Sequence, residues 1–131
     1  MRNLEGVRVT VWSAPAAGGE LAGVEKTLER LGCRLAAART SAEVERMLTA
    51  KGVDLIVARV TSGFREPLEF LKRRSQGLPP VLVVTTGNEV ELYLEAMRAG
   101  AFDAVGLPLD EQELMRITTC ALEEMHAPMA K

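Results

Sequence analysis

Arg59 is the residue whose position suggests chemistry most directly. It stands near the end of the aliphatic run Leu55–Val60, and Thr85 and Thr86 stand at the end of another such run. A guanidinium beside two hydroxyl groups is suited to contact an anion. In the alternative interpretation, Arg59 extends its charged end toward solvent and pairs with Glu66 or with a nearby carbonyl. The sequence leaves both interpretations open.

No set of catalytic residues accompanies Arg59. Ser13 has no histidine partner, because the only histidine, His126, lies near the C-terminus. Cys33 and Cys120 fall in a predicted strand and a predicted helix, where cysteine usually serves as a small apolar residue. The glycine-containing loop 13–19 has neither a GxGxxG pattern nor a Gly-Lys-Ser/Thr pattern, so we expect a plain turn. We therefore predict no enzyme, no cofactor and no metal site.

Five short apolar runs, which alternate with five helical patterns, must position these residues. The runs are Val7–Trp12, Cys33–Ala37, Leu55–Val60, Val81–Thr85 and Ala104–Leu107. Strict alternation of strand and helix predicts a parallel sheet with right-handed crossovers. Five such units favour an α/β, flavodoxin-like (βα)5 fold, with a doubly wound parallel sheet in the order 2-1-3-4-5. The ends of strands 1, 3 and 4 would then form one edge, where sites usually lie.

The predicted helices have recognisable ends. The segment 40–43 reads Thr-Ser-Ala-Glu, which is a capping box for the second helix. The segment 88–91 has a similar pattern before the fourth helix, and residues 110–113 open the fifth. Gly32 and Gly100 follow helical patterns and predict the ends of the first and fourth helices.

Composition limits the class of protein. The chain has 131 residues, 47% of them hydrophobic, which fits one globular domain over residues 1–131 with an ordered core at about 7–125. Its net charge of −2 gives no general attraction for nucleic acid or for anionic membranes, so we expect neither as a partner. No apolar run approaches the roughly 20 residues of a membrane span. The two cysteines form no disulfide framework, so we expect a cytoplasmic location.

The sequence resembles the receiver domain of bacterial two-component response regulators over about Val7–Met125. Residues 53–58 (VDLIVA) are similar to the family's third strand, and residues 78–86 (LPPVLVVTT) to its fourth. Residues 96–103 (AMRAGAFD) and 107–110 (LPLD) resemble the Gly-Ala-Asp-Asp and Lys-Pro-Phe elements that follow. The resemblance implies phosphorelay signal transduction, in which a histidine kinase transfers a phosphoryl group to an Asp that ends strand 3.

The chain departs from the family at the positions that carry this chemistry. The matching residues are Arg59 for the phosphoacceptor Asp, Leu107 for the Lys and Ala104 for the aromatic switch residue, while Thr85 is retained. Trp12 and Ser13 replace the acidic pair that binds Mg²⁺, and no acid occurs between residues 6 and 19. We therefore predict a degenerate receiver, or pseudo-receiver, whose altered pocket consists of Trp12, Ser13, Arg59, Thr61, Thr85, Thr86 and Leu107.

The leading functional hypothesis is a signalling module that acts by phosphorylation-independent protein–protein interaction, within a transcriptional or two-component regulator. The resemblance implies contact with a protein partner or effector domain through helix 4, strand 5 and helix 5. If Leu94 and Met97 point inward, Leu92 or Tyr93 is exposed, so we predict a homodimer contact that includes Leu92, Tyr93 and Ala104. The alternative hypothesis is an anion or small-ligand sensor that uses Arg59 and the hydroxyl groups of residues 85 and 86.

Overall fold

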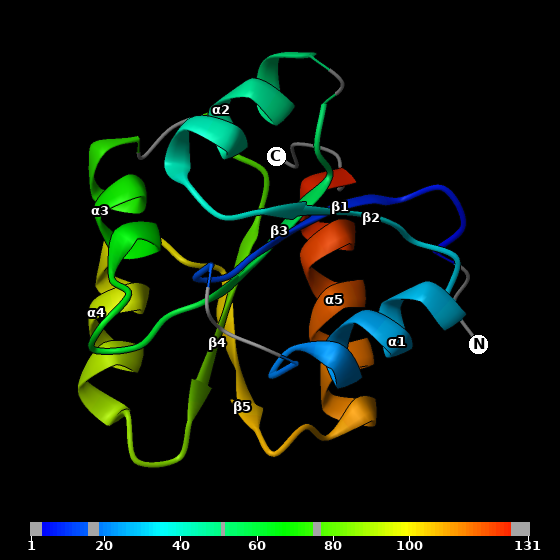
Figure 1. The fold of residues 1–131 in the computed structure, drawn as a ribbon. Helices are drawn as coiled ribbons and strands as arrows, with labels where there is room; N and C mark the ends of the chain where they lie inside the picture. The colour runs from blue at the N-terminus through cyan, green and yellow to red at the C-terminus, as the bar shows by residue number, and fades with distance from the viewer. Residues whose placement is uncertain (1–3, 16–18, 51, 75–76, 127–131) are drawn as a thin grey trace, which may run out of the picture.

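The computed structural model describes residues 4–15, 19–50, 52–74 and 77–126. Within these residues, strands and helices alternate along the chain (Figure 1). The elements are β1 (Arg8–Trp12), α1 (Ala22–Arg30), β2 (Arg34–Ala38), α2 (Ser41–Ala50), β3 (Leu55–Arg59), α3 (Glu66–Arg73), β4 (Val81–Thr86), α4 (Val90–Ala99), β5 (Asp103–Leu107) and α5 (Glu111–His126). The alternation predicted from the sequence is therefore confirmed, and no strand boundary differs from the prediction by more than one residue.

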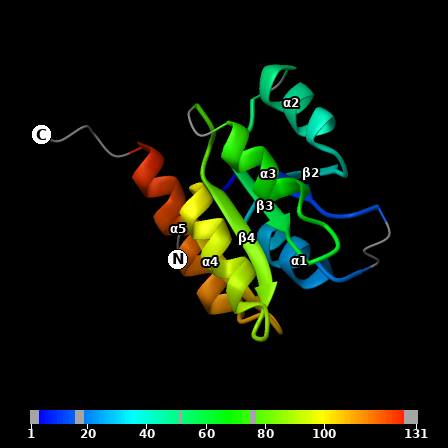
Figure 2. The ribbon, with the colours of Figure 1, turned by 90° about the vertical axis from the view of Figure 1, so that its left-hand side faces the viewer.

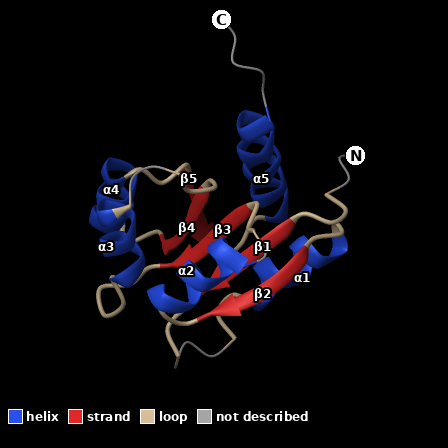
Figure 3. Ribbon diagram, turned by 90° about the horizontal axis from the view of Figure 1, so that it is seen from above, coloured by secondary structure: helices blue, strands red, loops and turns tan. Residues whose placement is uncertain are grey.

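The strands form one parallel sheet in the predicted order β2-β1-β3-β4-β5. Val9 of β1 is level with Leu35 of β2 on one side and with Leu55 of β3 on the other. The view from above shows the strands side by side, with helices around them (Figure 3). The flavodoxin-like fold is confirmed, and its parallel strands bring their carboxyl ends to one edge of the sheet.

Successive side chains of each strand point to opposite faces of the sheet and pack in two separate hydrophobic cores. One lies beneath α1 and α5 and includes Val9, Val57, Val84, Val24 and Ile117. The other lies beneath α2, α3 and α4 and includes Trp12, Ile56, Val83, Val44 and Leu92. Figure 2 shows α4 running back alongside β4, in the opposite direction to the strand. Because each fully buried aliphatic side chain contributes roughly 1.5–3 kcal/mol, the sheet is held firmly from both sides.

The end of α1 explains why β2 starts later than predicted. The chain reverses at Gly32, whose φ of +99° is accessible to glycine at little cost. The Cys33 N–H then donates to the Leu28 carbonyl at 3.1 Å, which closes the helix. Cys33 therefore belongs to the helix end, and β2 covers Arg34–Ala38 instead of the predicted Cys33–Ala37.

The predicted helix starts have different outcomes. The Thr40 hydroxyl accepts the Glu43 N–H at 3.1 Å, as the capping box predicts, whereas the Glu43 carboxylate accepts the N–H of Arg39. Asp110 accepts two N–H groups in the first turn of α5, as expected of an N-cap. The start of α4 differs from the prediction, since its N-cap residue Glu89 makes no side-chain capping bond. The Glu89 carboxylate has another partner, at the functional site.

Candidate functional site

The candidate site lies at the carboxyl edge of the sheet, where β3 ends at Arg59. All five residues of β3 are buried, and Arg59 is 5% exposed despite its charge. Side chains alternate between the faces of a strand, so Arg59 follows Leu55 and Val57 toward the α1 and α5 side. A guanidinium in this position must find partners, because an isolated buried charge is costly.

Two carboxylates and two carbonyl groups surround the Arg59 guanidinium. Its Nε and Nη2 donate to the two carboxylate oxygens of Glu20, both at 3.0 Å, in a bidentate pair. Its Nη1 donates to Glu89 Oε1 at 2.9 Å and to the carbonyl oxygens of Val60 at 2.8 Å and Val84 at 3.2 Å. Arg59, Glu20 and Glu89 are called the Arg59 cluster below. It joins the segment before α1, the end of β3 and the start of α4.

Backbone contacts fix Glu89 within this cluster. The Thr86 N–H donates to Glu89 Oε1 at 2.6 Å, and the Glu89 N–H donates to the Thr86 carbonyl at 3.1 Å. The Thr86 hydroxyl donates to the Asn88 amide oxygen at 2.6 Å. The turn between β4 and α4 is therefore tied both to itself and to Arg59.

The charges of the cluster stabilise one another. Hydrogen bonding from Arg59 lowers the pKa of Glu20 below its usual value, despite opposition from burial. Burial also acts to raise the pKa of Glu89, but the Thr86 N–H and Arg59 outweigh it, so that pKa is lowered. Burial disfavours the charge of Arg59, yet its two carboxylate partners raise its pKa overall. With one cation and two anions, the cluster carries a net charge of −1.

These contacts correct the predicted partner of Arg59. The expected contact with a nearby carbonyl is confirmed, whereas the pairing with Glu66 and the extension toward solvent are wrong, since Arg59 is 5% exposed. Glu66 accepts the N–H and hydroxyl of Ser41 instead, at 2.9 and 2.8 Å, and so joins α3 to α2. Two carboxylates already occupy the guanidinium and repel a third anion, so no observation favours the anion-sensor alternative.

Sequence reasoning missed Glu20 and Glu89. Each is far from Arg59 along the chain, by 39 and 30 residues respectively. A signal was nevertheless present, since both follow strands whose ends meet near Arg59 in the predicted sheet. A buried arginine at that edge requires a carboxylate partner, and these loops supply the candidates.

The rest of the predicted pocket is only partly assembled. Trp12 points to the other face, where its ring packs edge-on to Phe70 at 5.4 Å and to Phe64 at 6.5 Å. The Ser13 N–H donates to the Ala38 carbonyl, and Thr61 exchanges backbone hydrogen bonds with Phe64. Of the loop predicted as a plain turn, residues 16–18 lie outside the described residues.

Thr85, Thr86 and Leu107 do come together, beside a shallow hollow of about 340 Å³. This α4–β5 hollow is lined by Thr85, Thr86, Gly87, Glu89, Val90, Tyr93, Ala104, Gly106, Leu107 and Pro108. Two of the lining residues, Ala104 and Gly106, have little or no side chain. Val90, Tyr93 and Leu94 of α4 are exposed by 58%, 38% and 41%. An apolar surface therefore borders the hollow.

The orientation of α4 corrects the prediction for Leu92. The predicted contact at Leu92 assumes that Leu94 points inward, but Leu94 is exposed, whereas Leu92 is 7% exposed and belongs to the core beneath the helix. Leu92 and Ala96 are four residues apart and so share the buried face of α4. Leu92 is thus unavailable to a partner, while Tyr93 is accessible.

Among the described residues, no group of three or more His, Cys, Asp or Glu side chains is placed to hold a metal ion. In the same part of the chain, every helix is too short or too polar to cross a membrane.

The fold has many counterparts among solved structures, although no protein-family model and no curated protein matches the chain. The signal receiver domain of an HD domain-containing protein from Pseudomonas fluorescens Pf-5 is 21% identical, with a TM-score of 0.78 over 97% of this chain and 92% of that chain. The receiver domain of NtrX from Brucella abortus is 20% identical, with a TM-score of 0.74 over 88% and 98%. Full-length FixJ from B. japonicum is 22% identical, with a TM-score of 0.76 over 94% and 61%. The chain therefore has the fold of response-regulator receiver domains.

Proposed function

We propose that the chain is a non-enzymatic signalling module that acts through protein–protein contact and without phosphorylation. The observation that carries this proposal is the Arg59 cluster. In the resemblance, the position of Arg59 is that of the phosphoacceptor Asp. An arginine side chain stays protonated and so cannot act as that nucleophile. The guanidinium also donates to Glu20, Glu89 and two carbonyl groups.

The residues at this edge do not suit the Mg²⁺ ion that receiver chemistry uses. Mg²⁺ requires several oxygen ligands in near-octahedral geometry. Glu20 directs both carboxylate oxygens to Arg59, and Glu89 shares one with Arg59 and Thr86. The carbonyl of Thr61 accepts the Phe64 N–H at 3.1 Å. The positive charge of Arg59 adds repulsion, so we assign no role to Mg²⁺.

The Arg59 cluster also supports a fixed signalling surface. Glu89 is the N-cap residue of α4, and its carboxylate is bound by Arg59 at the end of β3. The start of α4 is thereby held by a group that belongs to the chain itself. Under this proposal, the surface of α4 and β5 has one conformation, which a partner recognises directly.

The surface proposed for that contact is the α4–β5 hollow with the exposed side chains of Val90, Tyr93 and Leu94. Aromatic residues are enriched in interfaces, because they bury a large apolar area with few rotatable bonds. The partner is a second copy of the chain or an effector domain. The solved structure from P. fluorescens offers a parallel, since that receiver domain belongs to an HD domain-containing protein.

Phosphorylation is tested with acetyl phosphate, Mg²⁺ and intact-mass spectrometry. We expect no added phosphate on the wild-type chain, and no rise of the melting temperature at millimolar Mg²⁺, since a specifically bound ion stabilises the folded state by mass action. A phosphorylatable receiver domain treated in parallel is the positive control. A stoichiometric, base-labile adduct would contradict the proposal, as would a saturable stabilisation by Mg²⁺.

The contact surface is tested by sedimentation velocity at tens of micromolar. We expect a wild-type dimer and a folded monomer for Tyr93→Asp, because a charge buried in the contact would lack a partner. Ala42→Asp adds the same charge at an exposed position of α2 and is the matched control, which should remain dimeric. A strictly monomeric wild type would refute self-association and leave an effector domain as the partner. Dimers of both variants would place the contact on another surface.

A further inference from the structure

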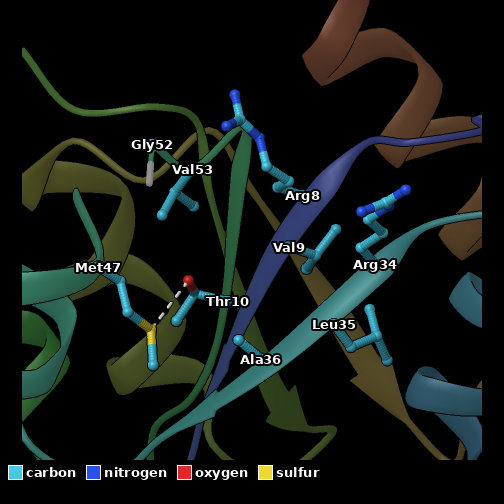
Figure 4. A pocket seen from close by; sticks show the side chains of 9 residues that line it. All are labelled: Arg8, Val9, Thr10, Arg34, Leu35, Ala36, Met47, Gly52 and Val53. Carbon is cyan, nitrogen blue, oxygen red and sulfur yellow. Dashed lines mark hydrogen bonds between the residues drawn. The ribbon is translucent and has the colours of Figure 1, made fainter. Parts of the chain in front are cut away.

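A second hollow lies at the opposite end of the sheet from Arg59, between α2 and the first halves of β1 and β2 (Figure 4). Its volume is about 250 Å³. The hollow is smaller than the roughly 300–1,000 Å³ pockets of drug-sized ligands, which favours a compact molecule. It is called the Arg34 hollow below.

The hollow exists because α2 packs on the sheet mainly through its first half. Val44 is fully buried, whereas Met47 and Leu48 are only half-buried. Ala36 of β2 presents a single methyl group beneath this part of the helix. Apolar side chains therefore border the hollow, with Met47 and Val53 on one side and Ala36 on the other (Figure 4).

One buried hydroxyl group within the hollow is weakly satisfied. Thr10 is 1% exposed, and its hydroxyl donates to the sulfur of Met47 at 3.5 Å. A thioether is a weak acceptor. Among the residues that the structure describes, no donor reaches the Thr10 oxygen. The Thr10 hydroxyl is therefore a weakly satisfied polar group in the wall of the hollow.

Two arginines stand at the mouth of the hollow. Arg8 and Arg34 are directly opposite each other in the pairing of β1 with β2. Asp54 accepts the Arg8 backbone N–H at 2.9 Å and its Nε at 3.4 Å, and the Arg8 guanidinium lies against Gly52, just past the end of α2. Arg34 forms no ion pair within the described part of the chain. Among the described residues, the mouth thus has the positive charges of Arg8 and Arg34 and the negative charge of Asp54, in a chain whose net charge is −2.

We propose that the Arg34 hollow binds a small monocarboxylate with a compact apolar body. The body would lie over Ala36 between Met47 and Val53, and the carboxylate would accept hydrogen bonds from the Arg34 guanidinium at the mouth. A single negative charge fits best, because Asp54 and the carbonyl end of α2 border the site and disfavour a second one. No residue of the Arg59 cluster or of the α4–β5 hollow takes part, so this site is independent of the proposed function.

The proposal is tested by titration of the chain with phenylacetate. Binding is measured by NMR on protein labelled with ¹⁵N and with ¹³C at the methionine methyl groups. We expect saturable shifts of the Met47 methyl and of the Thr10 and Ala36 amides. Phenylacetamide, which has the same shape without the charge, should bind at least about tenfold more weakly, in line with a charge-assisted hydrogen bond. Arg34→Gln should weaken phenylacetate binding by about tenfold and leave phenylacetamide binding unchanged.

Two substitutions in β2 separate the hollow from the rest of the surface. Ala36→Leu fills the hollow and should abolish binding. Ala37→Leu, at an exposed position on the other face of the same strand, should leave it intact. Arg34 is exposed, so Arg34→Gln decides the matter even if Ala36→Leu fails to fold. Any one of three results would overturn the proposal: no saturable shifts with phenylacetate, equal affinities for phenylacetamide and phenylacetate, or wild-type affinity of Arg34→Gln for phenylacetate.

Discussion

Replacement of Arg59 by methionine is expected to destabilise the chain through two buried carbonyl groups and one carboxylate. The Arg59 side chain is 6% exposed, and those of Glu20 and Glu89 are 38% and 19% exposed. Methionine has a similar length and no charge, so it removes the donors with little change of packing. Glu20 can then turn toward water, whereas Glu89 keeps only its contact with Thr86. The Val60 carbonyl loses its side-chain donor and, of its two described donors, the Val84 carbonyl keeps only the Val60 N–H at 3.3 Å.

The expected loss is about 3 kcal/mol of unfolding free energy. Removal of one partner from a buried ion pair typically costs roughly 3–5 kcal/mol, and the exposure of Glu20 places this case at the lower end. For a chain of this length, that corresponds to a fall of about 10 °C in the melting temperature. Arg30→Met removes an exposed pair with Glu111 and is the control, which should change stability little.

The pH dependence provides the sharper test. Both Glu20 and Glu89 have lowered pKa values in the folded chain. Their stabilisation is therefore fully present above the unfolded carboxyl pKa of about 4.3, and it is lost as the pH falls through the folded values. The difference between wild type and Arg59→Met, measured by urea unfolding, should be constant near neutral pH and shrink below about pH 4. A difference that persists unchanged at low pH, or equal stability at pH 7, would refute the reasoning.

Two further predictions concern α4 and the end of α1. Leu92→Asp should lower the free energy of unfolding, measured in urea, by several kcal/mol, because it buries an unpaired charge. Leu94→Asp should change stability little, because Leu94 is exposed. Similar losses for the two variants would contradict the observed orientation of α4. Gly32→Ala should be more destabilising than Gly100→Ala, although both glycines have positive φ. A Cβ at Gly32 would lie 2.8 Å from the Cα of Glu5, whereas the space at Gly100 is open. Equal melting temperatures of the two alanine variants would show that this contact relaxes freely.

The sheet could be predicted from the sequence because its signal is local. The aliphatic runs Leu55–Val60 and Val81–Thr85 indicate central strands, and a parallel sheet then brings their ends to one edge. That reasoning placed Arg59 at the site. It did not supply the partners, because Glu20 and Glu89 belong to loops whose side-chain directions depend on tertiary packing. Their contacts with Arg59 span 39 and 30 residues of chain.

Helix α4 shows a different limit of prediction. Its apolar residues Val90, Leu92, Tyr93, Leu94 and Met97 lie on more than one side of the helix. Periodicity alone therefore cannot decide which of them face the core. Packing against β4 decides it, and Leu92 is buried while Leu94 is not. The surplus of apolar residues was itself a valid signal, since it indicated that some of them must be exposed.

The Arg59 cluster is more informative about conformation than about stability. Replacement of every member of a buried ion pair by apolar residues often costs little, because desolvation of the charges offsets their attraction, whereas removal of a single partner is costly. The geometry of the cluster, however, ties Glu20 before α1 and Glu89 at the start of α4 to one strand end. A switch needs two states whose balance a ligand or modification can shift. The Arg59 guanidinium is part of the chain and is therefore always present. Unlike a ligand or a modification, it cannot be added or removed to shift the balance between two states. Under the proposed function, signalling therefore depends on whether a partner is present, and the α4–β5 surface stays constant.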